Sequence, residues 1–134
     1  MNWTLEVVVV PVADVDRAKD FYADRLGFHA EVTADFRVVQ LTSRGSGCSI
    51  TLLTGGGARM EPGSLKGLQL CVKDIRAARA HLVERGVEAS GVQVFEGGGP
   101  RPARVDDELD YAGFVFFEDP DGNAWAVQQM PGRE

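Results

Sequence analysis

The residues of this chain that could take part in chemistry are scattered, apart from one acidic run. Four carboxylates lie within residues 106–110 and could supply a general base or hold a cation. Tyr111 follows directly and could act as a proton donor, and Glu6 and Glu96 at the ends of predicted strands are the next candidates. Because charge runs usually face water, we interpret residues 106–110 as a solvated loop and assign no catalytic residue.

The usual catalytic groupings are missing from the sequence. It contains no Ser-His-Asp pattern and no nucleophile elbow. The glycine triplets at residues 55–57 and 97–99 lack the strand-to-helix context of a phosphate loop. The two histidines are isolated, since His29 follows the first predicted helix and His81 lies within the second.

The composition is ordinary for a globular protein, with 44% hydrophobic and 25% charged residues among 134. The net charge of −6 argues against nucleic acid as a partner, since phosphates require clustered lysine and arginine. No signal peptide or membrane-length apolar run is visible, so we expect a cytoplasmic protein. Cys48 and Cys71 fall in predicted strands as small buried hydrophobes, with a disulfide between them left open.

A repeated unit positions these residues. An apolar run followed by Val-x-Asp and an amphipathic helix occurs at residues 12–14 and again at 72–74, an offset of 60 residues. Two such half-domains that share a sheet create a cleft, which corresponding positions of both copies should line. We therefore interpret residues 1–134 as one domain. Its predicted parts are module one at 4–54, a linker at 55–65 and module two at 66–130.

Each module is predicted to have the order βαβββ. The expected elements of module one are a strand at 4–12, a helix from Asp14 to Gly27, and strands at 28–34, 36–42 and 47–54, with a tight turn at Ala34-Asp35. Those of module two are a strand at 67–73, a helix at 74–86, and strands at 87–96, 110–118 and 123–130. The polar, glycine-rich segment 97–109 predicts a mobile loop or lid, and Asp-Pro-Asp-Gly-Asn at 119–123 predicts a structural hairpin turn.

Together these features resemble the vicinal oxygen chelate superfamily, which includes glyoxalase I, bleomycin-resistance proteins and extradiol dioxygenases. The resemblance rests on the two modules, the Val-x-Asp helix starts, Phe21-Tyr22-x₃-Leu26-Gly27-Phe28 and the closing hairpin, and it covers nearly the whole chain. It implies an α+β fold in which two βαβββ modules form a curved, incomplete barrel around a cleft. It also implies a homodimer.

The resemblance further implies where a divalent metal would bind, and the residues there are unsuitable. Family enzymes use His, Glu or Gln side chains from the first and last strands of each module. The corresponding positions here are Val7, Thr51, Gly67 and Ala126. Only Thr51 offers a side-chain oxygen, and a neutral hydroxyl is a poor ligand on its own. We therefore predict neither a metal nor another cofactor.

Side-chain alternation along strands predicts which residues line the cleft. Counting back from the turn glycines makes Gln40 of module one equivalent to Val115 of module two, and Phe36 equivalent to Tyr111. A slip of one residue in the strand register would move these side chains to the other face of the sheet. Apolar walls with a few polar groups are typical of a small-molecule pocket, although such polar groups could also satisfy one another. Both histidines are expected outside the cleft. The predicted ligand-binding residues are Phe36, Gln40, Ser49, Thr51, Gln69, Tyr111 and Gln128.

Three functions fit this site, and they belong to different classes. The first is a metal-free module that binds a small hydrophobic or aromatic molecule, similar to the bleomycin-resistance branch. The second is a metal-independent isomerase, lyase or cyclase that uses Tyr111 or a carboxylate. The third is a metalloenzyme with a displaced ligand set drawn from Glu6, Gln69 or Gln128. In each case we expect a small-molecule ligand and a homodimer, without nucleic acid or membrane as a partner.

Overall fold

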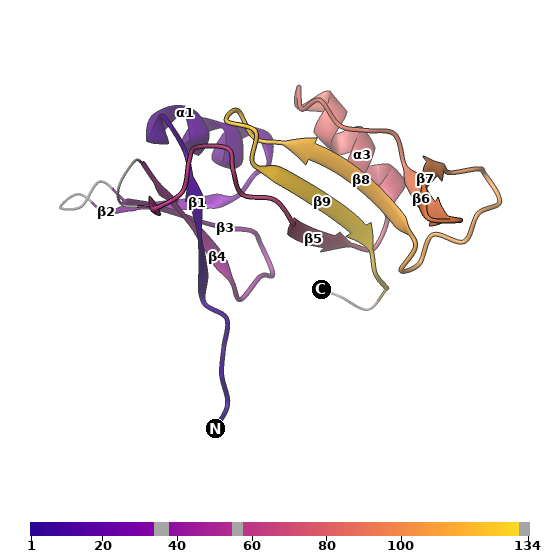
Figure 1. Ribbon diagram of the computed structural model, residues 1–134, viewed down its shortest axis with the longest axis horizontal. Helices are drawn as coiled ribbons and strands as arrows, with labels where there is room; N and C mark the ends of the chain where they lie inside the picture. The colour runs from indigo at the N-terminus through magenta and orange to yellow at the C-terminus, as the bar shows by residue number, and fades with distance from the viewer. Residues whose placement is uncertain (34–37, 55–57, 132–134) are drawn as a thin grey trace. The chain divides into compact units, whose positions relative to one another are not determined.

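The computed structural model describes residues 1–33, 38–54 and 58–131. It has an α+β architecture with two mixed sheets, one of four strands and one of five (Figure 1). The chain divides into two compact units, of which one holds Met1–Leu65 with Asp119–Asn123 and the other holds Lys66–Glu118 with Ala124–Glu134. Within the described ranges, no helix has both the length and the apolar character needed to cross a membrane.

The first unit has the predicted order βαβββ. Its elements are β1 (Val7–Pro11), α1 (Val15–Asp20), the π-helical turn η1 (Phe21–Arg25), β2 (His29–Thr33), β3 (Val38–Thr42) and β4 (Ser49–Leu53). The strands lie in the order β1-β4-β3-β2, with β1 parallel to β4 and the other pairs antiparallel. The predicted turn at Ala34-Asp35 lies outside the described residues.

The first helix begins where the sequence places its cap. The Asp14 side chain accepts a hydrogen bond from the backbone N–H of Arg17 at 3.1 Å, which satisfies a donor that the helix leaves free. Gly27, with a φ of +78°, follows η1 and ends the helical segment. Because α1 contacts β3 and β4, one face of the sheet forms the core. Its fully buried side chains include Val10, Ala18, Tyr22 and Leu52.

The second unit again begins with a strand and a capped helix. Its elements are β5 (Leu68–Val72), α3 (Ile75–Glu84), β6 (Gln93–Glu96), β7 (Gly99–Pro102), β8 (Gly113–Glu118) and β9 (Ala124–Gln129). The strand order is β5-β9-β8-β6-β7, and β5 is parallel to β9. Asp74 caps α3 by accepting from the Ala77 backbone N–H at 3.1 Å. The helix contacts β8 and β9 and covers one face of the sheet (Figure 1).

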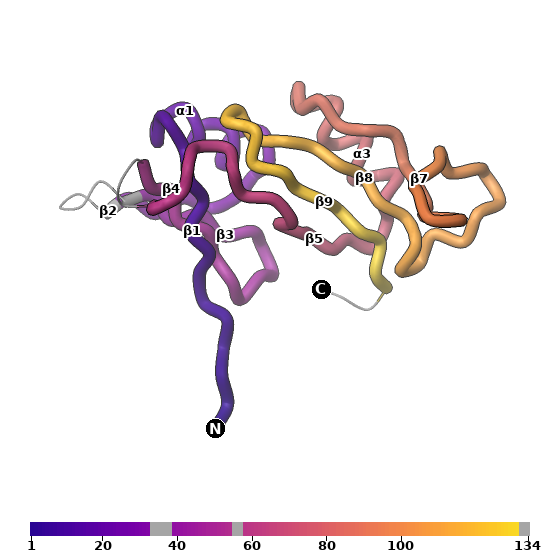
Figure 2. The backbone as a smooth tube through the Cα atoms, viewed as in Figure 1, coloured from indigo at the N-terminus to yellow at the C-terminus, as the bar shows by residue number. Residues whose placement is uncertain are grey.

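The second unit has one strand more than the sequence predicts. Residues 99–102, expected within a mobile loop, form β7, which pairs antiparallel with β6 in a hairpin (Figure 2). Gly97 and Gly98 have φ values of +63° and +91°, which a two-residue hairpin turn requires. The predicted strand at 87–96 is correspondingly shorter, since β6 begins only at Gln93.

Buried hydrogen bonds hold the turn at residues 119–123 within the first unit. Asn123 is fully buried, and its Nδ2 donates to the Pro11 carbonyl and to Asp119 Oδ2, both at 2.8 Å. Its Oδ1 accepts from the Leu65 backbone N–H at 3.1 Å. The Tyr22 hydroxyl donates to Asp119 Oδ2 at 2.7 Å. The turn is therefore a structural clamp, in agreement with the role expected from its sequence.

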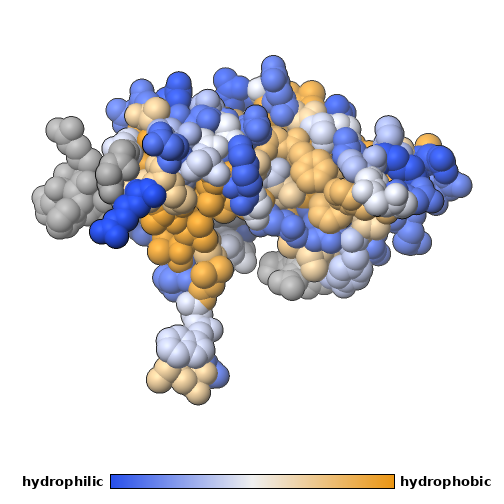
Figure 3. Space-filling model, in the orientation of Figure 1, coloured by the Kyte–Doolittle hydropathy of each residue, from blue (hydrophilic) through white to orange (hydrophobic). Residues whose placement is uncertain are grey.

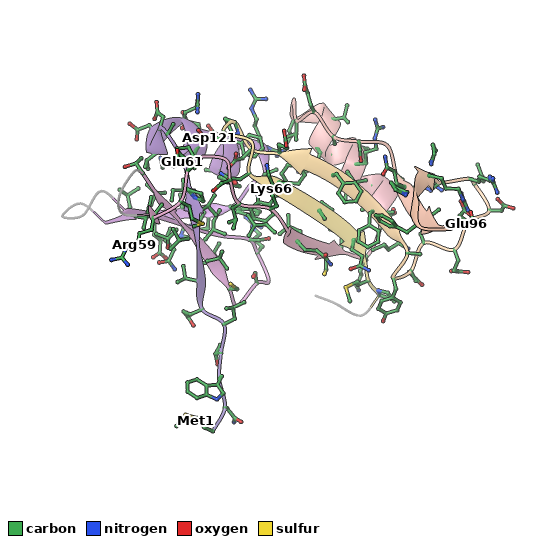
Figure 4. The ribbon with its side chains drawn as sticks, in the orientation of Figure 1. Met1, Arg59, Glu61, Lys66, Glu96 and Asp121 are labelled. Atoms are coloured by element: carbon green, nitrogen blue, oxygen red, sulfur yellow. The ribbon has the colours of Figure 1, made fainter. Side chains whose placement is uncertain are left out.

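Asp121 extends this clamp to the start of α1, beside which Figure 4 shows it. Its Oδ1 accepts from Arg17 Nη2 at 2.9 Å and from the Ala13 backbone N–H at 3.1 Å. On another side the Asp121 backbone packs against Gly63, where an added Cβ would lie 1.9 Å from the Asp121 carbonyl oxygen. Only glycine fits at that position.

Candidate functional site

One face of the four-stranded sheet groups three of the predicted ligand-binding residues. Gln40 on β3 lies directly opposite Thr51 on β4, which in turn pairs with Val9 on β1. These three side chains share the face that we call the first open face, and all are half-buried. Ser49 lies on the same face, and its hydroxyl is 2.6 Å from that of Thr42. This face is polar and partly accessible, as the alternation of side chains predicts.

One face of the five-stranded sheet groups the predicted glutamines of module two. Gln69 on β5 pairs with Ala126 on β9, so both lie with Gln128 on what we call the second open face. The Gln69 Nε2 donates to Gln128 Oε1 at 2.5 Å, and Gln128 Nε2 donates to the Tyr111 carbonyl at 2.9 Å. This chain of amides fixes the orientation of both glutamine side chains.

Three phenylalanines that the sequence analysis missed lie on the second open face. The ring of Phe95 on β6 meets Phe114 edge-on at 5.3 Å, and Phe114 stacks parallel to Phe116 at 6.0 Å. Phe114 and Phe116 are half-buried, and Phe95 is 54% exposed. Figure 3 shows hydrophobic surface gathered over β8 and β9 on the face turned to the viewer. We call these three rings the phenylalanine cluster.

The cluster was missed because the predicted register of β8 is wrong by one residue. In the first sheet Gln40 pairs with Thr51. Ala126 is the counterpart of Thr51 in the second sheet, and it pairs with Phe116 and not with Val115. Val115 is instead fully buried on the opposite face. The connection between β3 and β4 covers residues 43–48, whereas that between β8 and β9 covers only 119–123. Comparison of the two hairpin lengths would have revealed the shift.

The sequence predicted Tyr111 within a strand at 110–118, but β8 begins only at Gly113 and Tyr111 lies before it. It has a φ of +63°, its backbone N–H donates to the Gln129 carbonyl at 2.8 Å, and its side chain is exposed. Tyr111 is thus tied to β9 at the edge of the second open face through its backbone. Its predicted counterpart, Phe36, lies outside the described residues.

The positions at which the resemblance places metal ligands do not provide a suitable donor set. Val7 is exposed and pairs with Ser49, Gly67 precedes β5, and Ala126 pairs with Gln69, so Thr51 supplies the single side-chain oxygen of the four. The structure as described contains no group of three His, Cys, Asp or Glu side chains that could hold a metal ion. A divalent ion held by the four positions would therefore lack anionic or imidazole ligands.

Two expectations about reactive side chains are wrong. His29 was placed away from the predicted site, but it pairs with Thr42 and so shares the first open face, where its Nε2 lies 3.8 Å from Glu31. Cys71 was expected to be buried, but it is exposed on the second open face, with its Sγ 3.2 Å from the Met130 sulfur. His81 is exposed on α3.

Asp107, within the acidic run, pairs with an arginine of the β6–β7 hairpin. Arg101 donates two hydrogen bonds to its carboxylate, at 2.8 and 2.9 Å, and also bonds to Glu96, which Figure 4 shows at this hairpin. The Arg101 guanidinium, with help from the Arg104 backbone N–H, holds the pKa of Asp107 well below its usual range. Asp107 is therefore a structural anion and unsuited to act as a general base near neutral pH.

Replacing Arg101 with glutamine is expected to raise the pKa of Asp107 toward its ordinary value of about 4, while the remaining Arg104 N–H bond still holds it below that value. In the wild type the carboxylate stabilises the fold above that value, and the contribution is lost as the pH falls through the lowered folded-state pKa. The variant should lack the part of this contribution that Arg101 supplies. Carboxyl-detected NMR titration measures the change, with Asp106→Asn as the neighbouring control. A wild-type Asp107 that titrates near pH 4 would contradict the ion pair.

Comparison with known proteins places these features in context. The model of the Glyoxalase/Bleomycin resistance protein/Dioxygenase superfamily matches residues 4–127. TnmS3, an antibiotic binding protein from Streptomyces sp. CB03234, is 30% identical over 95% of both chains, with a TM-score of 0.72. A glyoxalase/bleomycin resistance protein from the same organism is 32% identical over 94% of this chain and 100% of that chain, with a TM-score of 0.71.

A more distant structure, a superfamily member from Sphaerobacter thermophilus DSM 20745, shares 24% identity over 95% of this chain and 97% of that chain, with a TM-score of 0.71. No curated protein matches the chain. The resemblance and the fold class predicted from the sequence are both confirmed by these matches.

Proposed function

Because the chain belongs to the Glyoxalase/Bleomycin resistance protein/Dioxygenase superfamily, we propose that it binds a small hydrophobic or aromatic molecule without a metal ion. The observation that carries this proposal is the phenylalanine cluster on the second open face. Aromatic rings that stay accessible beside oriented amide groups are typical of sites for planar organic ligands. The rings would stack on the ligand, and the glutamine amides would select its polar substituents.

The similarity to TnmS3 supports an antibiotic as the class of ligand to test first, since that protein is described as antibiotic binding. A thermal-shift panel of polycyclic aromatic antibiotics and simple aromatic metabolites tests the proposal. A ligand at 100 times its dissociation constant should stabilise the protein by about 2.7 kcal/mol. If no member of the panel raises the melting temperature, the ligand class is wrong.

Replacing Phe116 with leucine is expected to weaken binding of an aromatic hit about three- to tenfold, because stacking is lost while apolar volume is largely kept. Phe117→Leu is the matched control. Its ring is the next in sequence but lies on the buried face, stacked on Trp125 at 6.0 Å. That change should lower stability and leave the affinity of the folded protein unchanged. Isothermal titration calorimetry of both variants measures the difference, and equal affinities would contradict the proposed site.

The same experiments separate binding from the enzymatic alternatives. A ligand that is recovered unchanged supports sequestration, whereas a converted product supports the metal-independent isomerase, lyase or cyclase with Tyr111 or a carboxylate in its mechanism. A stoichiometric divalent ion in protein purified without chelator would favour a displaced metal site. Two of the groups named for that site, Gln69 and Gln128, hydrogen bond to each other.

We further propose that the protein works in the cytoplasm as a homodimer, and the segment before β1 supports the assembly. Apolar Met1, Trp3 and Leu5 alternate with polar residues there, and Trp3 and Leu5 are 87% and 71% exposed. Figure 4 shows Met1 at the far end of this extended segment. The segment leads into β1, an edge strand without charged residues. An amphipathic extended segment next to an uncharged edge favours strand pairing with a second copy.

Replacing both Trp3 and Leu5 with serine is expected to raise the dimer dissociation constant about 100-fold, since each apolar side chain would otherwise be buried. Light scattering should give twice 14.5 kDa for the wild type and a single chain for the variant at micromolar concentration. Asn2→Ser with Thr4→Ser, on the other face of the same segment, should remain dimeric. A monomeric wild type, or a double Trp3/Leu5 variant that dimerises normally, would refute the role of this segment.

A further inference from the structure

A concave site in the second unit is lined in part by residues of α3. Its volume is about 360 Å³. The helix supplies Arg76 and Arg79, and the other lining residues are Gly91, Val92, Pro102 and Ala103. None of these six residues is acidic, and the four that are not arginine have no polar side-chain atoms. We call this site the arginine cavity.

The two arginines of the cavity are held in place without being neutralised. They lie three residues apart on α3, so both side chains project from the same face of the helix. Arg79 Nε donates to the Ser90 carbonyl at 2.9 Å, and Arg76 Nη2 donates to the Arg104 carbonyl at 3.1 Å. A carbonyl orients a guanidinium but carries no net charge. Among the residues that the structure describes, neither arginine forms an ion pair.

The chain has 20 acidic and 14 basic side chains, yet in its described part no acidic side chain lies against either of these arginines. Two like charges at this helical spacing repel one another and destabilise the helix slightly. An anion between them would remove the repulsion. The remaining N–H groups of each guanidinium form a fork whose geometry suits two oxygens of one carboxylate or phosphate.

The rest of the lining is firmly built, so the cavity exists before any ligand arrives. The Ser90 backbone N–H donates to the Phe116 carbonyl, and the Phe116 backbone N–H donates to Ser90 Oγ, both at 2.9 Å. The Ala103 backbone N–H donates to the Val92 carbonyl at 2.9 Å. These bonds tie both lining segments to the sheet or to each other, which lowers the entropic cost of binding.

We infer that the arginine cavity binds a small organic anion, with its acidic group on Arg76 and Arg79 and its apolar body against Val92 and Ala103. The volume is near the lower end of the range found for small-molecule pockets, which suits a single-ring ligand. This inference does not depend on the ligand proposed for the phenylalanine cluster, because the two arginines lie on α3 and none of the three rings lines the cavity.

Titration of the full chain with benzoate, followed by amide NMR, tests the inference. Benzoate should give saturable shifts at Gly91, Val92 and Ala103. Acetate, which lacks an apolar body, should bind at least tenfold more weakly, and benzyl alcohol, which lacks the charge, should give no saturable shifts at these amides. Absence of saturation with benzoate, or equal binding of benzyl alcohol or acetate, would overturn the proposed ligand class.

Arginine variants test the site itself. Arg76→Gln removes an exposed guanidinium with little risk to the fold and should weaken benzoate binding at least fivefold, and adding Arg79→Gln should abolish it. Arg44→Gln is the matched control, since it makes the same charge change in an exposed turn of the first unit. Benzoate binding that survives the double change, or that Arg44→Gln weakens equally, would overturn the inference.

Discussion

Replacing Asn123 with alanine is expected to lower the free energy of unfolding by about 4 kcal/mol. The side chain is fully buried and makes three hydrogen bonds, to the Pro11 carbonyl, Asp119 Oδ2 and the Leu65 backbone N–H. The Pro11 carbonyl and Asp119 Oδ2 each lose one bond, worth about 1 kcal/mol, but keep those from the Gly63 N–H and the Tyr22 hydroxyl. The Leu65 N–H loses its acceptor, at a cost of about 1–3 kcal/mol. A loss of this size is a large fraction of the stability of a typical domain.

Urea denaturation followed by circular dichroism measures the effect of Asn123→Ala. Asn2→Ala makes the same chemical change in an exposed segment and should alter stability by less than about 0.5 kcal/mol. A loss below about 1 kcal/mol for Asn123→Ala would show that water or a backbone shift replaces the buried bonds.

Replacing Gly63 with alanine is expected to be the most damaging small change in the chain. The new Cβ would lie 1.9 Å from the Asp121 carbonyl oxygen and 2.9 Å from its carbonyl carbon, so backbone would have to move. The φ of +80° adds strain, because side chains other than glycine rarely adopt it. We expect a loss of more than about 3 kcal/mol, at the upper end of single-residue effects.

Alanine variants at two other glycines distinguish the cost of the steric clash from the cost of the backbone strain. Gly67 has a φ of +92° but open space around its Cβ position, so Gly67→Ala should cost only about 1 kcal/mol. Gly47 has open space and no positive φ, so Gly47→Ala should be close to neutral. The melting temperature should therefore be highest for Gly47→Ala, lower for Gly67→Ala and lowest for Gly63→Ala. Equal effects at Gly63 and Gly67 would show that the close approach to Asp121 is relieved at no cost.

The features that the sequence predicts well are those that local chemistry determines. Asp14 and Asp74 cap their helices because a carboxylate next to a free backbone N–H needs no tertiary context. Side chains alternate strictly along β1, β4, β5 and β9, so assigning one residue of a strand to a face of the sheet assigns all the others. This places Gln40 and Thr51 together, and Gln69 with Gln128, from spacing alone.

The features that the sequence analysis missed depend on pairing between strands. The Phe114-Val115-Phe116-Phe117 run is apolar on both faces, so its hydrophobic pattern cannot reveal which ring is accessible. The β6–β7 hairpin escaped notice because its glycines and prolines are typical of loops. The pairing that defines it becomes evident only when Arg101 is seen to bond to Glu96 and Asp107.

The membership of residues 119–123 in the first unit has a consequence for the autonomy of the two sequence repeats. A fragment that ends at Leu65 would lack Asp119 and Asn123, and would leave the Tyr22 hydroxyl and the Pro11 carbonyl without these partners. The amino-terminal repeat therefore cannot complete its own interior, and its folding must wait for a pentapeptide encoded more than fifty residues downstream. A chain cut between the repeats should therefore regain the native structure of the first unit only when both pieces are mixed.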